Sequence, residues 1–452
     1  MKRTIELLLA AVLGISASPA AAWVNHTLEA WPALAALPEM KAAPAVRAES
    51  LDAFLAAEAR GLEQVLQDEE AWARSNVALY PARPDALAFR AGGAQTELRQ
   101  RFIAAVRINP GMKLKLFVQA LPGANVAGKA TLPWTEVTTR RRESSAQESI
   151  YLQLREGEPV APLDVVATAT DEPDYGMDIG LWEDNGTAYG RIYGFGRQPF
   201  GNPALEFASQ APFHMGFFHE ASIVYQAAGF LRRTYPEYRI HLWQTLARYA
   251  LRTGHDYWGW RFAGWALHYV EDLTQPYHAT VLPGVSVPRL LWINTLDLLG
   301  VHGPKKDAIT LVSNRHLALE NYQYRRVRSA YARHDADDAL LRALADLSTD
   351  AGRSAWADDS ARASVSAQAH ALAAVTDAVL EQSLPRKYVS DPGYVLGETE
   401  SGLDLYALLA QSAPASRDAM SGMVSGLLRN FGVYTRAFIR SLLARPQAQP
   451  SR

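Results

Sequence analysis

The segment from His268 to His278, HYVEDLTQPYH, concentrates side chains that bind metals or transfer protons. His268 and Asp272 are four residues apart, and this spacing places two side chains on the same face of a helix. Pro276 ends a helix, and the turn that follows can bring His278 back toward the same region. The spacing therefore predicts that two imidazoles and one carboxylate converge.

A second pair, His316 and Glu320, repeats the four-residue spacing further along the chain. The sequence contains no cysteine, so any metal must be held by His, Asp, Glu or backbone groups, and imidazole with carboxylate suits zinc. Either pair alone is typical of a solvated surface contact. The occurrence of both pairs, with His278 beyond the proline, favours a metal site.

The run LHYVEDLTQPYHA resembles the signature of the bacterial zinc-dependent phospholipases C. Their superfamily also includes the single-strand-specific zinc nucleases of fungi and plants. In these proteins the two histidines and the aspartate of this run bind a cluster of three zinc ions, and a downstream His–Glu or His–Asp pair supplies further ligands. The resemblance implies a cofactor of three zinc ions and the ligands His268, Asp272, His278, His316 and Glu320.

The N-terminal segment extends the resemblance. Residues 1–22 combine a basic start, an apolar run and a small-residue Ala-Ala-Ala end, which is typical of a cleaved signal peptide. Cleavage would leave Trp23 first, and members of the family begin with a Trp whose amine and carbonyl bind metal, followed shortly by a His. The resemblance therefore implies Trp23 and His26 as ligands, and we expect a secreted or periplasmic protein.

Two further ligands of the family lie upstream of the main run, an aspartate and then a histidine. The segment TDEPDYGMD offers Asp171, Asp174 and Asp178. The phospholipase pattern favours Asp174, whereas the nuclease pattern favours Asp171. His214 and His219 are the candidate histidines, and His214 is preferred because it falls in an irregular stretch before a helix. We also expect Asp174 to accept the proton of an attacking water, as a catalytic residue.

A zinc cluster of this kind predicts hydrolysis of phosphate esters. The carboxylates of Asp174, Asp272 and Glu320 offset only half the charge of three zinc ions, so the site attracts a phosphodiester anion. Zinc also lowers the pKa of bound water and so provides hydroxide near neutral pH.

The substrate is predicted from the details of the run. The variants HY at 268–269, YHA at 277–279 and Glu at 320 favour a phospholipase C that acts on phospholipid or at a membrane surface. Single-stranded nucleic acid is the alternative substrate, since the tryptophan-rich chain has aromatic rings for base stacking. A secreted, non-catalytic protein with structural zinc is the second alternative. No obligate protein partner is inferred.

Composition and periodicity describe the framework. The 452 residues are 48% hydrophobic with a net charge of −2, which gives no broad basic surface for duplex nucleic acid. Helical spacing of apolar residues extends over 44–75 and over seven segments after about residue 204, whereas 112–170 has the alternation and breakers of strands and loops. The seven segments are 221–233, 239–254, 256–272, 315–333, 337–348, 361–384 and 423–444.

We therefore expect a mainly α protein, a multi-helix bundle of the zinc phospholipase C and nuclease type. Residues 23–445 are predicted to form a single domain, with a strand-and-loop insert at about 75–168 that the family lacks, and residues 446–452 a disordered tail.

Overall fold

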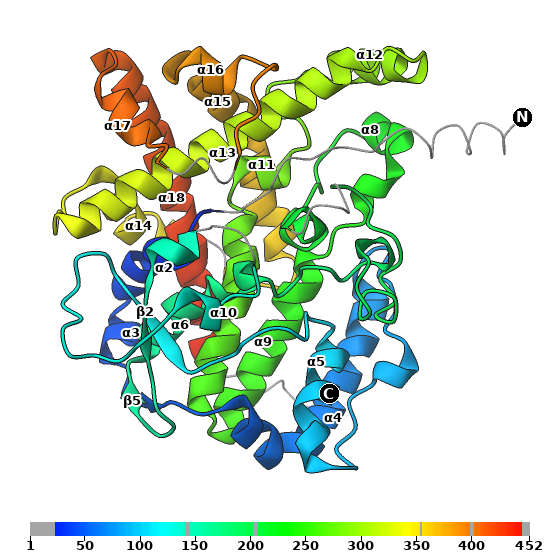
Figure 1. Ribbon diagram of the computed structural model, residues 1–452, viewed down its shortest axis with the longest axis vertical. Helices are drawn as coiled ribbons and strands as arrows, with labels where there is room; N and C mark the ends of the chain where they lie inside the picture. Colours follow the sequence, from blue (N-terminus) through cyan, green and yellow to red (C-terminus); the bar gives the residue numbers. More distant parts are fainter. Residues whose placement is uncertain (1–22, 141–144, 202–206, 353–354, 398–401, 445–452) are drawn as a thin grey trace, which may run out of the picture.

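The computed structural model describes residues 23–140, 145–201, 207–352, 355–397 and 402–444. This part of the chain is mainly α-helical, as the sequence predicts (Figure 1). Its α-helices are α2 (His26–Ala35), α3 (Pro38–Ala42), α4 (Leu51–Asn76), α5 (Leu98–Val106), α6 (Pro162–Ala169), α7 (Ala211–His214), α8 (Ser222–Ala227), α9 (Pro236–Thr253), α10 (Asp256–Asp272), α11 (Pro276–Ala279), α12 (Val287–Leu298), α13 (Gly303–Ala332), α14 (Ala339–Ala345), α15 (Ala367–Ser383), α16 (Arg386–Val389), α17 (Leu405–Ala410) and α18 (Pro414–Leu443). The predicted signal peptide, 1–22, and the predicted tail, 446–452, lie outside the described residues.

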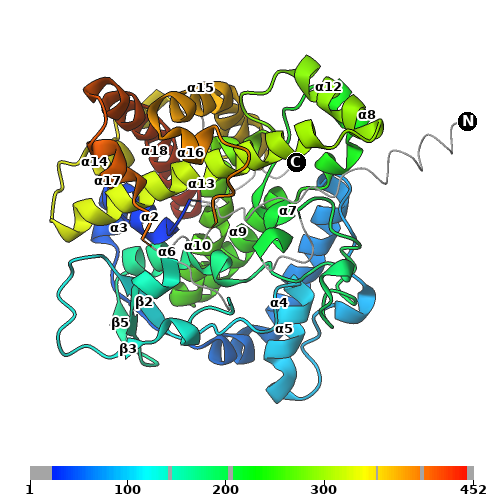
Figure 2. The same cartoon turned by 45° about the horizontal axis from the view of Figure 1, so that its top comes forward.

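Helix α10 lies in the interior, and other helices enclose it. α9 lies alongside it, and α6 and α18 pack against it, as the two views of Figures 1 and 2 show. Its sequence, DYWGWRFAGWALHYVED, is apolar on most faces, which is typical of a helix without a solvent-exposed side. Every residue from Tyr257 to Asp272 is buried. The last turn of α10 therefore holds His268 and Asp272 inside the protein.

The turn after α10 is a second, short helix. The side chain of Gln275 accepts a hydrogen bond from the backbone N–H of Tyr277 at 2.9 Å and so caps the start of α11. Pro276 occupies the first turn of α11, a position where its missing N–H costs no helical hydrogen bond. As a result α11 directs His278 back, and His278 Nδ1 lies 3.8 Å from Asp272 Oδ1.

The strands form two small antiparallel sheets. They are β1 (Val46–Arg47), β2 (Phe117–Ala120), β3 (Thr131–Leu132), β4 (Ile150–Gln153) and β5 (Pro159–Val160). β1 pairs with β5, and β4 lies between β2 and β3, with Val118 and Thr131 both opposite Leu152. β2 also packs on α6. The strands β2 to β5 fall within 112–170, and they support the helix that leads to Asp171.

Several helices begin or end at residues that periodicity does not predict. The helix predicted from residue 44 begins at Leu51, because residues 46–47 pair with β5 and the Ser50 side chain caps the helix at the Ala53 N–H. The segment 221–233 is not one helix, since α8 ends at Ala227 and a separate 3-10 turn, Gly229–Arg232, follows.

The two longest C-terminal helices also exceed their predicted ranges. α13 begins at Gly303 and α18 at Pro414, each about ten residues before the apolar periodicity becomes regular. In both helices a proline stands in the first turn, where it fits without loss of a backbone hydrogen bond. The longer α13 has room for α12, α15, α16 and α17 to pack along it.

Gly264 allows α10 to approach α6 closely, and its substitution provides a test of this packing. A Cβ at this position would lie 2.5 Å from Ala169 Cβ and 2.6 Å from the Val166 carbonyl oxygen. Gly264→Ala should therefore lower the free energy of unfolding by about 1–3 kcal/mol, the usual effect of overpacking a core, measured as a lower urea midpoint.

The matched control is Gly422→Ala on α18, where a Cβ would meet no atom within 4 Å. There alanine should raise stability by up to about 1 kcal/mol, because it favours the helix more than glycine does. An unchanged or higher midpoint for Gly264→Ala would show that the two helices are not in close contact.

Candidate metal centre

Side chains from elements far apart in the sequence meet around the last turn of α10. Within the described part of the chain, their nitrogen and oxygen atoms form three groups capable of binding a metal ion, and in each group these atoms lie within 4.8 Å of one another. The groups are His26–Asp174–His268, His214–His268–Asp272 and His278–His316–Glu320. All these residues are buried, Asp174 with 8% exposure being the least so.

The structure thus collects eight of the sequence-predicted residues into these groups. Their sources are α2 for His26, the 3-10 turn Glu172–Tyr175 for Asp174, α7 for His214, α10 for His268 and Asp272, α11 for His278, and α13 for His316 and Glu320.

Asp272 stands at the centre of the arrangement. Its Oδ2 lies 2.8 Å from His214 Nδ1 and 3.3 Å from His268 Nε2. Its Oδ1 lies 3.4 Å from His26 Nε2. Although both oxygens are buried, neither is aligned with a hydrogen-bond donor among the described residues. A buried carboxylate in that state is costly unless a cation satisfies it, so the surroundings of Asp272 favour a bound cation.

The outer nitrogens of several histidines are fixed by acceptors outside the groups. The donor in each case is Nδ1: His268 donates to the Thr170 carbonyl at 2.7 Å, His278 to the His214 carbonyl at 3.1 Å, and His26 to the Glu271 carboxylate at 2.9 Å. An imidazole that carries its proton on Nδ1 presents a lone pair on Nε2 when it is neutral. Such outer contacts orient metal-binding histidines in proteins generally.

Two of the inner nitrogens face each other directly. His268 Nε2 and His214 Nδ1 are 2.9 Å apart, and the other nitrogen of His214 lies 3.4 Å from Asp178 Oδ2. Two neutral rings held in this way would direct lone pairs at each other, which is repulsive. A proton or a metal ion must therefore stand between these atoms or beside them.

The third group lies where α11 meets α13. The rings of His278 and His316 are edge to face with centroids 5.0 Å apart, and His316 Nε2 lies 2.6 Å from Glu320 Oε1. Tyr277 stacks on the other side of His316, with the rings 5.3 Å apart. Burial, and then the neighbouring His278, hold the pKa of His316 well below its ordinary value, which favours the neutral imidazole that a metal ion requires.

The carboxylates make the first two groups favourable for positive charge. Burial alone would raise the pKa of Asp272, but the adjacent His268 and His214 hold it well below the ordinary value. Burial alone would lower the pKa of His214, but Asp272 and Asp178 raise it to about 10. Burial also raises the pKa of Asp171 to about 6. Metal ions fit this donor set, which consists only of imidazole nitrogens and carboxylate oxygens.

The two candidate aspartates have different positions. Asp171 accepts a hydrogen bond from the backbone N–H of His26 at 2.9 Å with one oxygen and from the Tyr175 hydroxyl at 2.7 Å with the other. Asp174 belongs to a group, with its Oδ1 3.9 Å from His268 Nε2. Asp174 therefore belongs to the candidate centre, whereas Asp171 holds the start of α2 through the His26 backbone N–H.

The two candidate histidines are also separated. His214 is buried and forms the last residue of α7, a short helix where the sequence predicts an irregular stretch. His219 lies partly exposed outside the groups, and its Nε2 donates to the Arg362 carbonyl at 3.0 Å. Only His214 joins the candidate centre.

The spacing of the candidate ligands does not predict the residues that support the groups. Asp178, a third candidate aspartate, accepts hydrogen bonds from Arg239 and the Tyr269 hydroxyl, each at 2.6 Å. Glu271, which no ligand pattern marks, accepts from His26 and, at 2.9 Å, from the Thr435 hydroxyl. One sequence feature could have predicted this role of Glu271. It is adjacent to Asp272, which places it on the neighbouring face of the same buried turn.

Trp23 lies beside the same turn. Its indole Nε1 donates to the Glu271 carbonyl at 3.2 Å and to the Thr274 hydroxyl at 3.1 Å. The side chain is fully buried and meets the Phe431 ring edge-on, with centroids 6.3 Å apart. The first described residue of the chain is thus anchored next to the C-terminal end of α10.

Comparisons of the chain with protein-family models, with curated proteins and with solved structures find no match. Among the described residues, no helix combines the length and apolar character needed to cross a membrane.

Asp272→Asn provides a direct test of the centre. The change preserves shape but removes the charge that faces His214, His268 and His26, so zinc affinity should fall by more than about tenfold, the loss expected from even an outer-contact residue of a metal site. The measurement is zinc content after equilibrium dialysis.

Asp164→Asn is the matched control. Asp164 lies on α6, accepts a hydrogen bond from the Trp31 indole at 3.2 Å and belongs to none of the groups. The variant should bind zinc as the unmodified protein does. Equal zinc content in both variants, with unchanged helical circular dichroism, would contradict a metal centre at Asp272.

Proposed function

We propose that this protein is an exported, zinc-dependent hydrolase of phosphate esters that acts as a phospholipase C, with the helical fold of the zinc phospholipase C and nuclease superfamily. It would cleave a phospholipid to diacylglycerol and a phosphorylated head group. The observation that carries the proposal is that Asp272 faces His214 and His268 with one oxygen and His26 with the other. Shared carboxylates of this kind are a means of holding metal ions close together.

Three zinc ions would be held by three sets of residues, two of which share Asp272. His214, His268, Asp272 and Asp174 would hold one; His26 and Asp272, with the amine and carbonyl of Trp23, a second; His278, His316 and Glu320 a third. When bound, zinc supplies positive charge for a phosphodiester anion and acidifies water.

The protein's own residues would position and deprotonate the reacting groups. Asp174 is the carboxylate closest to solvent in the first two groups, with 12% of its side chain exposed against 0% for Asp272. Gln210 Nε2 donates to Asp174 Oδ1 at 2.9 Å and orients the carboxylate. The second oxygen of Asp174 would accept the proton of the attacking water. Asp171 would hold His26 in place through the backbone N–H.

The surroundings of the third group support a preference for phospholipid over nucleic acid. His316 and its stacking partner Tyr277 line a pocket whose other walls are largely apolar. Such a wall favours a lipid over a nucleic acid, which needs polar or cationic groups for its phosphates. The nuclease and the non-catalytic zinc protein are the outcomes against which the proposal is tested.

The test is an assay of zinc-loaded protein on phosphatidylcholine and on single-stranded DNA. Diacylglycerol should be released from the lipid, lost with a chelator and restored by added zinc. His268→Ala should lower the rate by at least about a hundredfold, because zinc supplies both the charge and the nucleophile. Asp164→Asn serves again as the control.

Cleavage of DNA without release of diacylglycerol would assign the nuclease activity instead. Full zinc content without hydrolysis of either substrate would indicate a non-catalytic zinc protein.

The proposed role of Trp23 has its own test. A protein that begins at Trp23 has a free amine there, whereas one with an added residue before Trp23 has an amide, which does not bind zinc readily. The extended form should bind one zinc ion fewer and lose most activity while remaining helical. The control is a residue added at the C-terminus. Full zinc occupancy and activity in the N-terminally extended form would exclude the amine as a ligand.

A further inference from the structure

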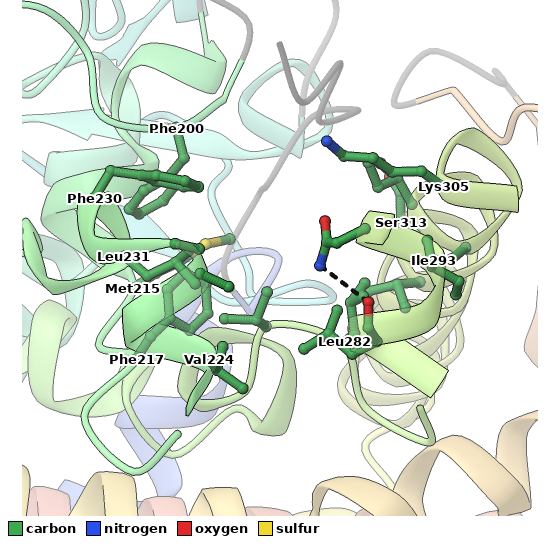
Figure 3. Close-up of a pocket in the computed structure, with 18 of the residues that line it drawn as sticks. Phe200, Met215, Phe217, Val224, Phe230, Leu231, Leu282, Ile293, Lys305 and Ser313 are labelled. Atoms are coloured by element: carbon green, nitrogen blue, oxygen red, sulfur yellow. Dashed lines mark hydrogen bonds between the residues drawn. The ribbon is translucent and has the colours of Figure 1, made fainter. Parts of the chain in front are cut away.

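An apolar pocket lies beside the third group, between the segment that carries α8 and the helices α12 and α13. Figure 3 shows Phe200, Phe217 and Phe230 on one side of it and Ile293 and Lys305 on the other. His316 and Tyr277 also line it. The pocket therefore adjoins an imidazole of the candidate metal centre.

Three of the polar side chains in the wall of this pocket are engaged with the protein itself. The Asn294 amide donates to the Leu290 carbonyl of its own helix at 3.0 Å, the Lys305 ammonium to Asp297 at 2.7 Å, and the Tyr277 hydroxyl to Asp377 at 2.8 Å. A ligand with many polar atoms would lose hydrogen bonds to water and gain few here. A hydrocarbon chain needs none, because burial alone stabilises it.

Helix α12 is apolar on two faces. Leu290 and Ile293 line the pocket, whereas Trp292 and Leu298 are 62% and 52% exposed. A helix with apolar residues on both faces is normally covered on both, yet among the described elements α12 packs chiefly on α8 and α13. Its outer face is therefore left without a cover by the rest of the described chain.

Several exposed apolar side chains belong to the helices of this corner and the residues that follow α12, and we call them together the α8–α12 rim. Its members are Ile223, Trp292, Leu298, Leu299 and Val301, each at least 42% exposed. α8 and α12 lie together at one corner of the molecule in both views (Figures 1 and 2). Exposed apolar side chains that are grouped in this way mark a surface for a partner or a membrane.

We propose that the α8–α12 rim inserts into the surface of a phospholipid bilayer and that the pocket behind it takes one acyl chain of the lipid. The phosphate ester would then lie at His316. Helix α12 contributes side chains to both the rim and the pocket, which connects the bilayer to the metal centre. Arg289 and Lys306 are exposed on α12 and α13 and would meet lipid phosphates, as cations beside an apolar helix face do at membrane interfaces. The role in catalysis rests on the proposed function, but the binding of lipid does not.

The rim is tested by co-sedimentation with vesicles of phosphatidylcholine and of phosphatidylglycerol, in chelator so that no lipid is hydrolysed. Leu299→Asp changes a residue that is 74% exposed, so the fold should tolerate it. It should weaken vesicle binding by about tenfold or more, since the change removes the favourable burial of a leucine side chain in the bilayer. Val395→Asp, at a residue 60% exposed outside the rim, is the matched control and should bind as the unmodified protein does.

Equal binding by Leu299→Asp and the unmodified protein would overturn the rim. So would absence of vesicle binding together with a dimer that Leu299→Asp dissociates, because the rim would then cover a second copy of the chain.

The pocket is tested with a fluorescent fatty acid, also in chelator. Ala308 lines the pocket on α13, and Ala308→Trp would fill it, so affinity for the fatty acid should fall by about tenfold while vesicle binding remains. The control Ala407→Trp places the same side chain on the exposed surface of α17. Equal affinity in both variants would overturn the acyl-chain pocket.

The same variants separate this inference from the proposed function. With zinc bound, Ala308→Trp should lower hydrolysis of phosphatidylcholine at least tenfold more than that of bis(4-nitrophenyl) phosphate, a small soluble phosphodiester. Equal loss on both substrates would overturn the pocket's part in catalysis. If the unmodified protein binds vesicles and fatty acid but hydrolyses neither ester, the proposed function fails and the lipid-binding surface stands.

Discussion

The contact on which the structure most depends is that between the Asp272 carboxylate and the histidines around it. A fully buried carboxylate is unfavourable unless positive charge accompanies it, and both oxygens of Asp272 face imidazole nitrogens that come from other elements. Each neighbouring element must therefore end or turn where it delivers its histidine to this point. α7 ends at His214, α2 begins at His26 and α11 returns immediately after α10. The positions of these short elements follow from the need to surround one charge.

The large apolar core makes this arrangement possible by keeping α10 rigid and dry. Gly264 allows α6 to approach, which brings the Thr170 carbonyl within reach of His268. On the other side, Thr435 of α18 holds Glu271, which in turn orients His26. The supporting contacts thus come from helices that are themselves packed in the core, and such rigid support is what a site with preset geometry requires. The apolar corner formed by α8 and α12 lies outside this core and leaves apolar side chains exposed.

Much of the site could be predicted from local spacing, whereas its supporting contacts could not. The two members of each pair, His268–Asp272 and His316–Glu320, are four residues apart, so a helix alone brings them together. The structure places both pairs in the groups. The choice of Asp174 over Asp171 was beyond local spacing, because it depends on which carboxylate the backbone of His26 occupies. The predicted start of the helix at residue 44 was wrong for a similar reason, because residues 46–47 pair with β5, some 110 residues away. Helix α12 lies outside the segments predicted to be helical, and which of its sides faces a pocket depends on the packing of α13.

Anomalous X-ray diffraction at the zinc absorption edge, from crystals of the zinc-loaded protein, would locate the metal ions directly. We expect three anomalous peaks around the end of α10, two of them within bonding distance of opposite oxygens of Asp272 and the third between His278, His316 and Glu320. Crystals with no peak at these groups, or with the Asp272 carboxylate hydrogen-bonded to protonated histidines in the presence of excess zinc, would contradict this expectation. In that case the carboxylate and its histidines would be a buried charge network without a metal.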